Sequence, residues 1–83
     1  MLHESDHDVD WSSVSILTIL EMAIAHEVEA RDYYHRAAEC AGNPHTRDML
    51  LRLSEMEQGH ADTLQEELND LLIQRDLEGA IAD

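Results

Sequence analysis

Two side chains in the second half of the chain have the types and the spacing that bind metal ions. Glu57 and His60 are three residues apart, so an α-helix would present both on one face, between Leu53 and Leu64 at the same helical phase. Burying an unpaired carboxylate among leucines costs several kcal/mol unless a cation or a proton compensates its charge. A metal ion compensates it best, and we predict that the pair binds one. The alternative is a protonated Glu57 hydrogen-bonded to His60.

A third acid, Glu27, occupies the corresponding place in the first half of the chain. It lies seven residues after Leu20 and seven before Tyr34, with Ala23 and Ala30 beside it, a spacing that predicts an inward helix face. Two copies of the set would supply four carboxylates and two imidazoles, the ligands of carboxylate-bridged di-iron bundles. Such ligands suit iron or manganese, and zinc would also bind.

The acid-x-x-His spacing occurs twice more in this sequence. Asp32 and His35 lie among Arg31 and Arg36 and away from the apolar positions, so we interpret these residues as a solvated helix face. Glu4 and His7 belong to a flexible acidic arm expected over residues 1–12.

Two long helices are expected to position the three side chains. One spans about 13–41, where neither Gly nor Pro occurs, and the second spans about 44–77, before Gly79 and a frayed end over 79–83. The hairpin unit is thus 13–78. The apolar face of the second helix is predicted to consist of Met49, Leu50, Leu53, Met56, Ala61, Leu64, Leu68, Leu71 and Leu72.

The break between the helices is marked by Gly42, Asn43 and Pro44. Gly suits the left-handed position after a helix end, Asn can cap the next helix, and Pro fits its first turn. A turn this short folds the helices back as an antiparallel hairpin. One hairpin leaves an open side, so we expect an all-α fold in which two hairpins dimerise into a four-helix bundle.

Composition excludes several classes of partner. The chain has 83 residues with 19 Asp and Glu against five Lys and Arg, a net charge of −14 that argues against nucleic acids and anionic membranes. Cys40 is the only cysteine, which excludes a four-cysteine metal site and an intrachain disulfide. No apolar stretch approaches a membrane span and the first ten residues are acidic, so we expect a cytoplasmic protein.

These motifs resemble those of the ferritin-like superfamily, in which rubrerythrin and bacterioferritin helices show Glu-x-x-Ala with a following Tyr and then Glu-x-x-His. The matching segments here are Glu27-Val28-Glu29-Ala30 with Tyr34, and Glu57-Gln58-Gly59-His60. The 30-residue separation of the two glutamates is most similar to that of encapsulated ferritins, two-helix chains that dimerise into the bundle. The resemblance covers about residues 14–72.

The resemblance implies a ferroxidase that binds iron(II) at a di-iron centre across a dimer interface and oxidises it with dioxygen or peroxide, for iron storage or detoxification. Manganese or zinc could replace iron. By this analogy Glu27, Glu57 and His60 bind the metals, and Tyr34 hydrogen-bonds to the site, acts as a redox neighbour, or is an ordinary core residue. The family's outer site, through which iron enters, would correspond to His26, Glu29 and Tyr33.

The resemblance also implies partners: a homodimer at least, a ring-like oligomer of dimers, and an encapsulating shell protein, which would place the chain inside a protein compartment. The C-terminal residues are acidic and do not resemble a shell-docking peptide. Two other functions stay open. One is a rubrerythrin-like peroxide-scavenging di-iron protein, although the rubredoxin cysteines are missing. The other is a non-catalytic helical oligomerisation module in which Glu27 and Glu57 are protonated or paired with Arg.

Overall fold

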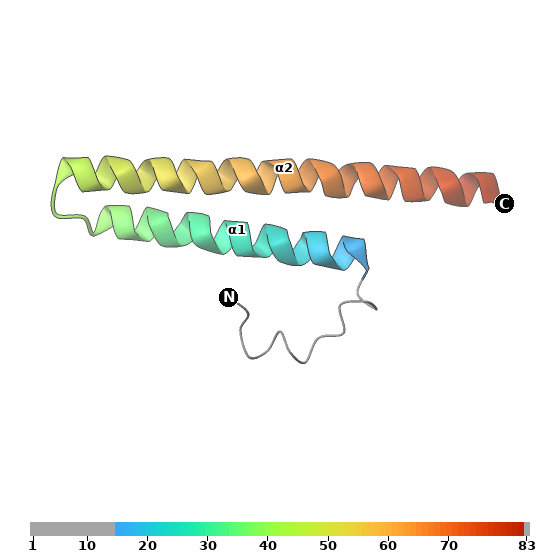
Figure 1. Cartoon of the computed structure of the whole chain (residues 1–83), viewed down its shortest axis with the longest axis horizontal. Coiled ribbons are helices and arrows are strands. Elements are labelled where there is room, and N and C mark those ends of the chain that lie inside the picture. Colours follow the sequence, from blue (N-terminus) through green and yellow to red (C-terminus); the bar gives the residue numbers. More distant parts are fainter. Residues whose placement is uncertain (1–14, 83) are drawn as a thin grey trace, which may run out of the picture.

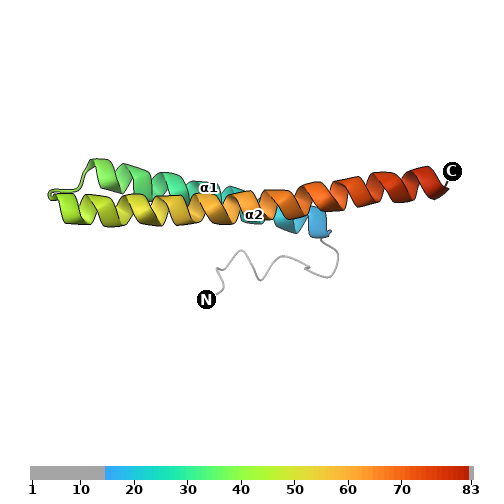
Figure 2. The same cartoon turned by 90° about the horizontal axis from the view of Figure 1, so that it is seen from above.

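The chain folds, in a computed structural model, into two antiparallel helices, which confirms the expected all-α hairpin. The structure describes residues 15–82, and from residue 80 onward only their backbone. Helix α1 spans Ile16–Glu39 and helix α2 spans Pro44–Ala82. Figures 1 and 2 show them side by side over the length of α1, with α2 projecting beyond it. The arm predicted over residues 1–12 lies outside the described residues.

Helix α1 begins at Ile16, three residues after the predicted start near residue 13, because Ser15 caps it. The Ser15 backbone is extended, and its Oγ accepts a hydrogen bond of 3.2 Å from the Thr18 N–H. This bond satisfies one of the donors that a helix N-terminus leaves unpaired. At the other end α1 stops at Glu39, within two residues of the predicted end, a difference usual for helix termini.

The turn between the helices uses two of the three expected signals. Asn43 Oδ1 accepts a 2.8 Å hydrogen bond from the Thr46 N–H, and Pro44 is the first residue of α2, which confirms both predictions. The prediction for Gly42 is wrong, because no described residue has a positive φ. The N–H groups of Cys40 and Ala41 donate to carbonyls three residues back at 3.1 and 3.2 Å. This tightened last turn satisfies the helix end without a left-handed residue.

The second helix ends later than the predicted position near residue 77, and the frayed segment expected over 79–83 stays a prediction. Helix α2 continues through Gly79 to Ala82. A glycine with negative φ is a helix residue weaker than alanine by about 1 kcal/mol, and not a stop signal. Since α2 has 39 residues and α1 has 24, α2 overhangs α1 by roughly 20 Å.

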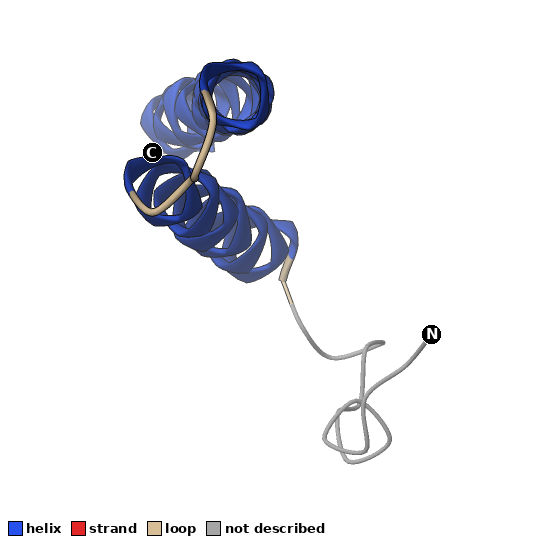
Figure 3. Ribbon diagram, turned by 90° about the vertical axis from the view of Figure 1, so that its left-hand side faces the viewer, coloured by secondary structure: helices blue, strands red, loops and turns tan. Residues whose placement is uncertain are grey.

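The core of the single hairpin is small. Its buried apolar residues are Ala38, Ala61 and Leu68, and Ser54 is buried with them at 6% exposure. Figure 3 shows the reason from the end of the hairpin: each described helix has only the other beside it. The predicted apolar face of α2 is therefore only partly covered, with Met49 and Met56 about half exposed. Neither described helix has a stretch long and apolar enough to cross a membrane.

Gly59 provides a test of α2 as one continuous helix. An added Cβ at Gly59 would meet nothing within 4 Å. We expect Gly59→Ala to raise the free energy of unfolding by about 0.5–1 kcal/mol, since alanine loses less backbone entropy in a helix. Urea unfolding of the metal-free chain, followed by circular dichroism, measures the change.

The matched control is Gly42→Ala. Its Cβ also has open space, but Gly42 lies in the turn and not in a helix. An equal gain at both glycines, or a loss at Gly59, would contradict the continuous helix.

Candidate metal centre

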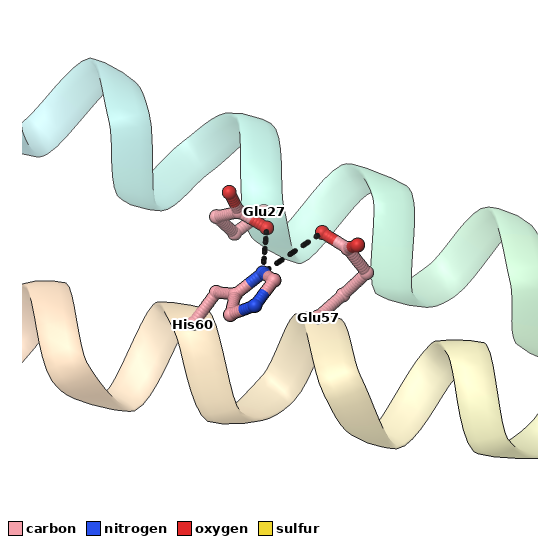
Figure 4. A group of neighbouring side chains, drawn as sticks. All are labelled: Glu27, Glu57 and His60. Carbon is pink, nitrogen blue, oxygen red and sulfur yellow. Dashed lines mark ion pairs between the residues drawn. The ribbon is translucent and has the colours of Figure 1, made fainter.

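The three predicted ligands meet in the seam between the helices. Glu27 extends from α1 toward Glu57 and His60 on α2, as Figure 4 shows. The Nδ1 atom of His60 lies 3.5 Å from Oε2 of Glu27 and 3.9 Å from Oε2 of Glu57. One ligand atom of each residue lies within 4.8 Å of the others, close enough to hold one ion. The structure thus brings together the side chains that the sequence singled out, from segments 30 residues apart.

The backbone positions around the group explain why the carboxylates point inward. Glu57 follows Ser54 by three residues and precedes Ala61 by four, and these two are among the most buried residues of α2. Residues at such spacings share one helix face. Glu57 therefore lies on the line of α2 that contacts α1, and its side chain is only 21% exposed.

Exposure differs between the acids and the imidazole. The side chain of Glu27 is 27% exposed, close to Glu57, whereas that of His60 is 58% exposed. The group therefore opens toward one side of the hairpin through His60. Met56 lies on that side, since it precedes His60 by one helical turn, and it is 56% exposed.

One carboxylate oxygen of the group lacks a partner. Glu27 Oε2 is buried and accepts no hydrogen bond within the described part of the chain. Its 3.5 Å separation from the His60 nitrogen is an ion-pair contact and too long for a good hydrogen bond. Buried polar atoms are normally paired, because leaving one unpaired costs free energy. Two carboxylates and an imidazole, with a buried oxygen still to be satisfied, fit a divalent cation such as iron(II).

The proximity of the two acids perturbs Glu57. A side-chain hydrogen bond with Glu27 raises the pKa of Glu57 above its ordinary value of 4.5, and burial and repulsion by the Glu27 charge raise it further. The charge of His60 and its hydrogen bond act in the opposite direction. Without a metal the pair therefore retains a proton more strongly than a free glutamate does. A cation that binds here would compete with that proton.

Tyr34 and the outer residues occupy different surroundings. Tyr34 is half-buried, its ring packs edge-on against Tyr33 at 5.6 Å, and within residues 15–79 no hydrogen bond joins it to the three ligands. The role of Tyr34 in the site stays a prediction. His26, Glu29 and Tyr33 line one open hollow of α1. Their role as an outer entry site stays a prediction.

The other acid-x-x-His pairs stay apart from the centre. His35 contacts Glu39 at 3.3 Å on the exposed surface of α1, in agreement with its interpretation as a solvated face. Asp32 contacts Arg31, its neighbour in sequence, at 2.8 Å. Glu4 and His7 lie outside the described residues.

The sequence interpretation missed a polar contact beside the centre. Arg31, assigned to the solvated face, donates a 2.6 Å hydrogen bond across the seam to Gln58. The available signal was its position four residues after Glu27, which puts both on one face of α1. Ser54 was also overlooked, although a serine within a leucine-rich face is itself unusual.

Comparison with known proteins identifies one family whose model matches the chain. The family model described as Rubrerythrin matches residues 18–81, which include both helices and all three clustered side chains. A search of curated proteins and a search of solved structures each find no match.

The raised pKa of Glu57 predicts how the stability of the metal-free chain depends on pH. The folded chain holds this proton more tightly than the unfolded chain, so the corresponding stability is complete below pH 4.5 and is lost as the pH rises through the raised pKa. Glu57→Gln mimics the protonated group at every pH. We expect the variant to be more stable than the wild type at pH 8, with a difference that shrinks toward pH 4.5.

Urea unfolding in the presence of a chelator, across this pH range, measures the difference. Glu55→Gln is the control, because Glu55 is exposed on the same helix and lies outside the cluster. A stability gain from Glu57→Gln that is the same at every pH, or is matched by Glu55→Gln, would contradict the proton-sharing pair.

Proposed function

The chain belongs to the rubrerythrin family, and from that premise we propose that it is a ferroxidase that binds and oxidises iron(II), for iron storage or detoxification. The observation that carries the proposal is the convergence of Glu27, Glu57 and His60 on one point of the helix seam. Oxygen and imidazole ligands bind iron(II) well, and the acidic chain attracts cations.

The proposed reaction transfers electrons from iron, which is the substrate. Two iron(II) ions give one electron each to dioxygen, which takes up two protons and leaves as hydrogen peroxide. With peroxide as the oxidant, two electrons and two protons yield two water molecules. The products are iron(III) ions in both cases.

The protein's own groups supply charge, geometry and a proton. Glu27 and Glu57 provide two negative charges in a seam that holds them mostly away from water, where electrostatic interactions are strong. The half-exposed His60 lies at the open side and adds a neutral nitrogen donor. A cation that binds here competes with the proton that Glu57, with its raised pKa, holds, so binding becomes stronger as the pH rises.

We further propose that two hairpins associate around this centre. Three ligands from one chain leave a metal ion with open positions, and two copies would complete a centre of four carboxylates and two imidazoles. The exposed methionines support this arrangement: Met49, Met56 and His60 recur at seven and four residues along α2, so they share the side on which the group opens. A hairpin with so small a core gains the apolar burial that it lacks.

A second candidate is reduction of peroxide by the same centre, which the match to the rubrerythrin family favours. The two functions differ in the oxidant that reacts faster with the iron-loaded chain. A non-catalytic helical module is the third, and it predicts that iron(II) does not bind at Glu57. Both alternatives are outcomes of the iron-loading experiment.

Anaerobic loading with iron(II), followed by native mass spectrometry, tests the ligand set. We expect about two irons for every two chains, as in di-iron carboxylate bundles, and loss of this iron in Glu57→Ala. Glu55→Ala removes an exposed acid from the same helix and is the matched control. The iron-loaded chain is then mixed with dioxygen or with peroxide while iron(III) is followed by absorbance.

Each result separates the functions. Faster oxidation by dioxygen than the same iron(II) shows without protein, lost in Glu57→Ala, is the ferroxidase result. A response to peroxide alone would favour the peroxide-scavenging alternative. Iron that binds equally well to Glu57→Ala and the wild type would exclude both.

The proposed dimer is tested by placing a charge on the open side. We expect Met56→Asp to raise the dimer dissociation constant by more than about tenfold, because burying an unpaired carboxylate costs several kcal/mol. Sedimentation equilibrium measures this constant. Gln65→Glu is the control, since it adds the same charge at an exposed position of α2. Dimerisation that Met56→Asp leaves unchanged would show that this side is not the interface.

A further inference from the structure

Apart from the contacts among Glu27, Glu57 and His60 themselves, two hydrogen bonds cross between α1 and α2 within the described residues, and both use Arg31. The Nη1 atom of Arg31 donates to Oε1 of Gln58 over 2.6 Å. The Oγ atom of Ser54 donates to the backbone carbonyl of Arg31 over 2.9 Å. Outside the group of metal ligands, the directional hydrogen bonds of the helix seam are thus concentrated at one residue of α1.

This point lies beside the metal centre on both helices. Arg31 follows Glu27 by four residues, one helical turn, on the same face of α1. On α2, Gln58 directly follows Glu57, and Ser54 precedes it by three residues. The two bonds therefore connect the turn of α1 that carries one ligand with the turn of α2 that carries the others.

Acids on each helix orient the two long side chains. Oδ1 of Asp32 accepts from Nε of Arg31 at 2.9 Å and lies 2.8 Å from Nη2. Oδ1 of Asp62 accepts from Nε2 of Gln58 at 2.8 Å. The bond from Ser54 is the most protected from water, because Ser54 is only 6% exposed. Hydrogen bonds shielded in this way are stronger and more restrictive than those on an open surface.

The rest of the seam restricts the geometry of the centre less than Arg31 and its hydrogen-bond partners do. The buried apolar side chains of the hairpin are Ala38, Ala61 and Leu68, and contacts between apolar side chains have no preferred direction. The turn over residues 40–43 joins the helices at one end, but Glu27 lies twelve residues before the last residue of α1, about 18 Å along the helix. Small rotations of one helix against the other are therefore possible at the centre unless a directional contact prevents them. Metal ligation tolerates only a few tenths of an ångström.

We propose that Arg31 is a positioning residue which, through Gln58 and Ser54, holds Glu27 opposite Glu57 and His60. Arg31 acts on the metal through the placement of Glu27 and does not bind the metal itself. The inference rests on the proposed function, because it concerns the same metal centre. An ordinary surface ion pair between Arg31 and Asp32 would contribute little and would leave metal binding unchanged.

The test compares two glutamines of α2 in the full chain. Gln58 and Gln65 each donate a hydrogen bond to the side chain four residues further on, but only Gln58 also bonds across the seam. Cobalt(II) is titrated into Gln58→Leu and Gln65→Leu, with the Kd and the visible absorption spectrum as readouts. We expect a Kd about 10- to 100-fold weaker for Gln58→Leu with an altered spectrum, as when outer groups that orient metal ligands are removed. Gln65→Leu should stay within about twofold of the wild type.

Arginine variants supply a second pair. Arg31→Leu and Arg36→Leu remove the same charge from α1, but Arg36 makes no hydrogen bond among the residues that the structure describes. We expect weak cobalt binding for Arg31→Leu only. Titrations are made at a temperature where each variant retains its full helical circular dichroism, so lower stability alone leaves the Kd unchanged. If Arg31→Leu does not fold, the uncharged pair of glutamine variants decides.

The outcomes distinguish the positioning role from the metal centre itself. If the wild type binds cobalt(II) and Glu57→Ala does not, while Gln58→Leu binds as tightly as Gln65→Leu with an unchanged spectrum, the positioning role of Arg31 is overturned and the centre stands. If the wild type does not bind cobalt(II), or if Glu57→Ala binds it equally well, both proposals are overturned.

Discussion

Two carboxylates and an imidazole lie inside the seam between the helices, where burial makes an uncompensated charge costly. Glu27 and Glu57 are mostly shielded from water and close enough to share a proton, so the metal-free chain keeps a repulsive pair where apolar packing would be more stable. A buried oxygen of Glu27 without a hydrogen bond adds to this cost. Native chains retain unfavourable groups of this kind mainly at functional sites. A cation bound in this seam would remove both the repulsion between the acids and the unpaired oxygen.

The same constraint explains why the polar contacts between the two helices gather around the centre. Apolar side chains hold α1 and α2 together but do not fix their relative rotation, whereas a metal centre requires ligands at fixed positions. Arg31 bonds across the seam one turn from Glu27, and its partners flank Glu57. Apolar side chains elsewhere in the seam stabilise the hairpin through their burial, and these few polar groups orient one helix relative to the other. The hairpin thus separates the residues that stabilise it from those that align it.

A single hairpin also leaves its centre open on one side. His60 and the methionines of α2 remain about half exposed there, while the buried core consists of a few small or medium side chains. A fold of this size usually needs a partner, a metal or both for stability. In the proposed dimer, the second copy supplies both the apolar burial that the hairpin lacks and the further ligands that the metal needs.

The two helices, their hairpin and the inward placement of Glu27, Glu57 and His60 could be predicted from the sequence, because helical periodicity fixes which residues share a face and a polar residue among leucines is conspicuous. Helix ends were less certain: Gly42 and Gly79 have ordinary helical or turn conformations, since glycine permits a left-handed turn without requiring one. Only the tertiary structure decided which residues meet across the seam. Arg31 looked solvent-facing because its charge suggested water, yet its long side chain reaches Gln58 on the other helix. Such contacts depend on the rotation of one helix against the other, and no periodicity within a single helix contains that information.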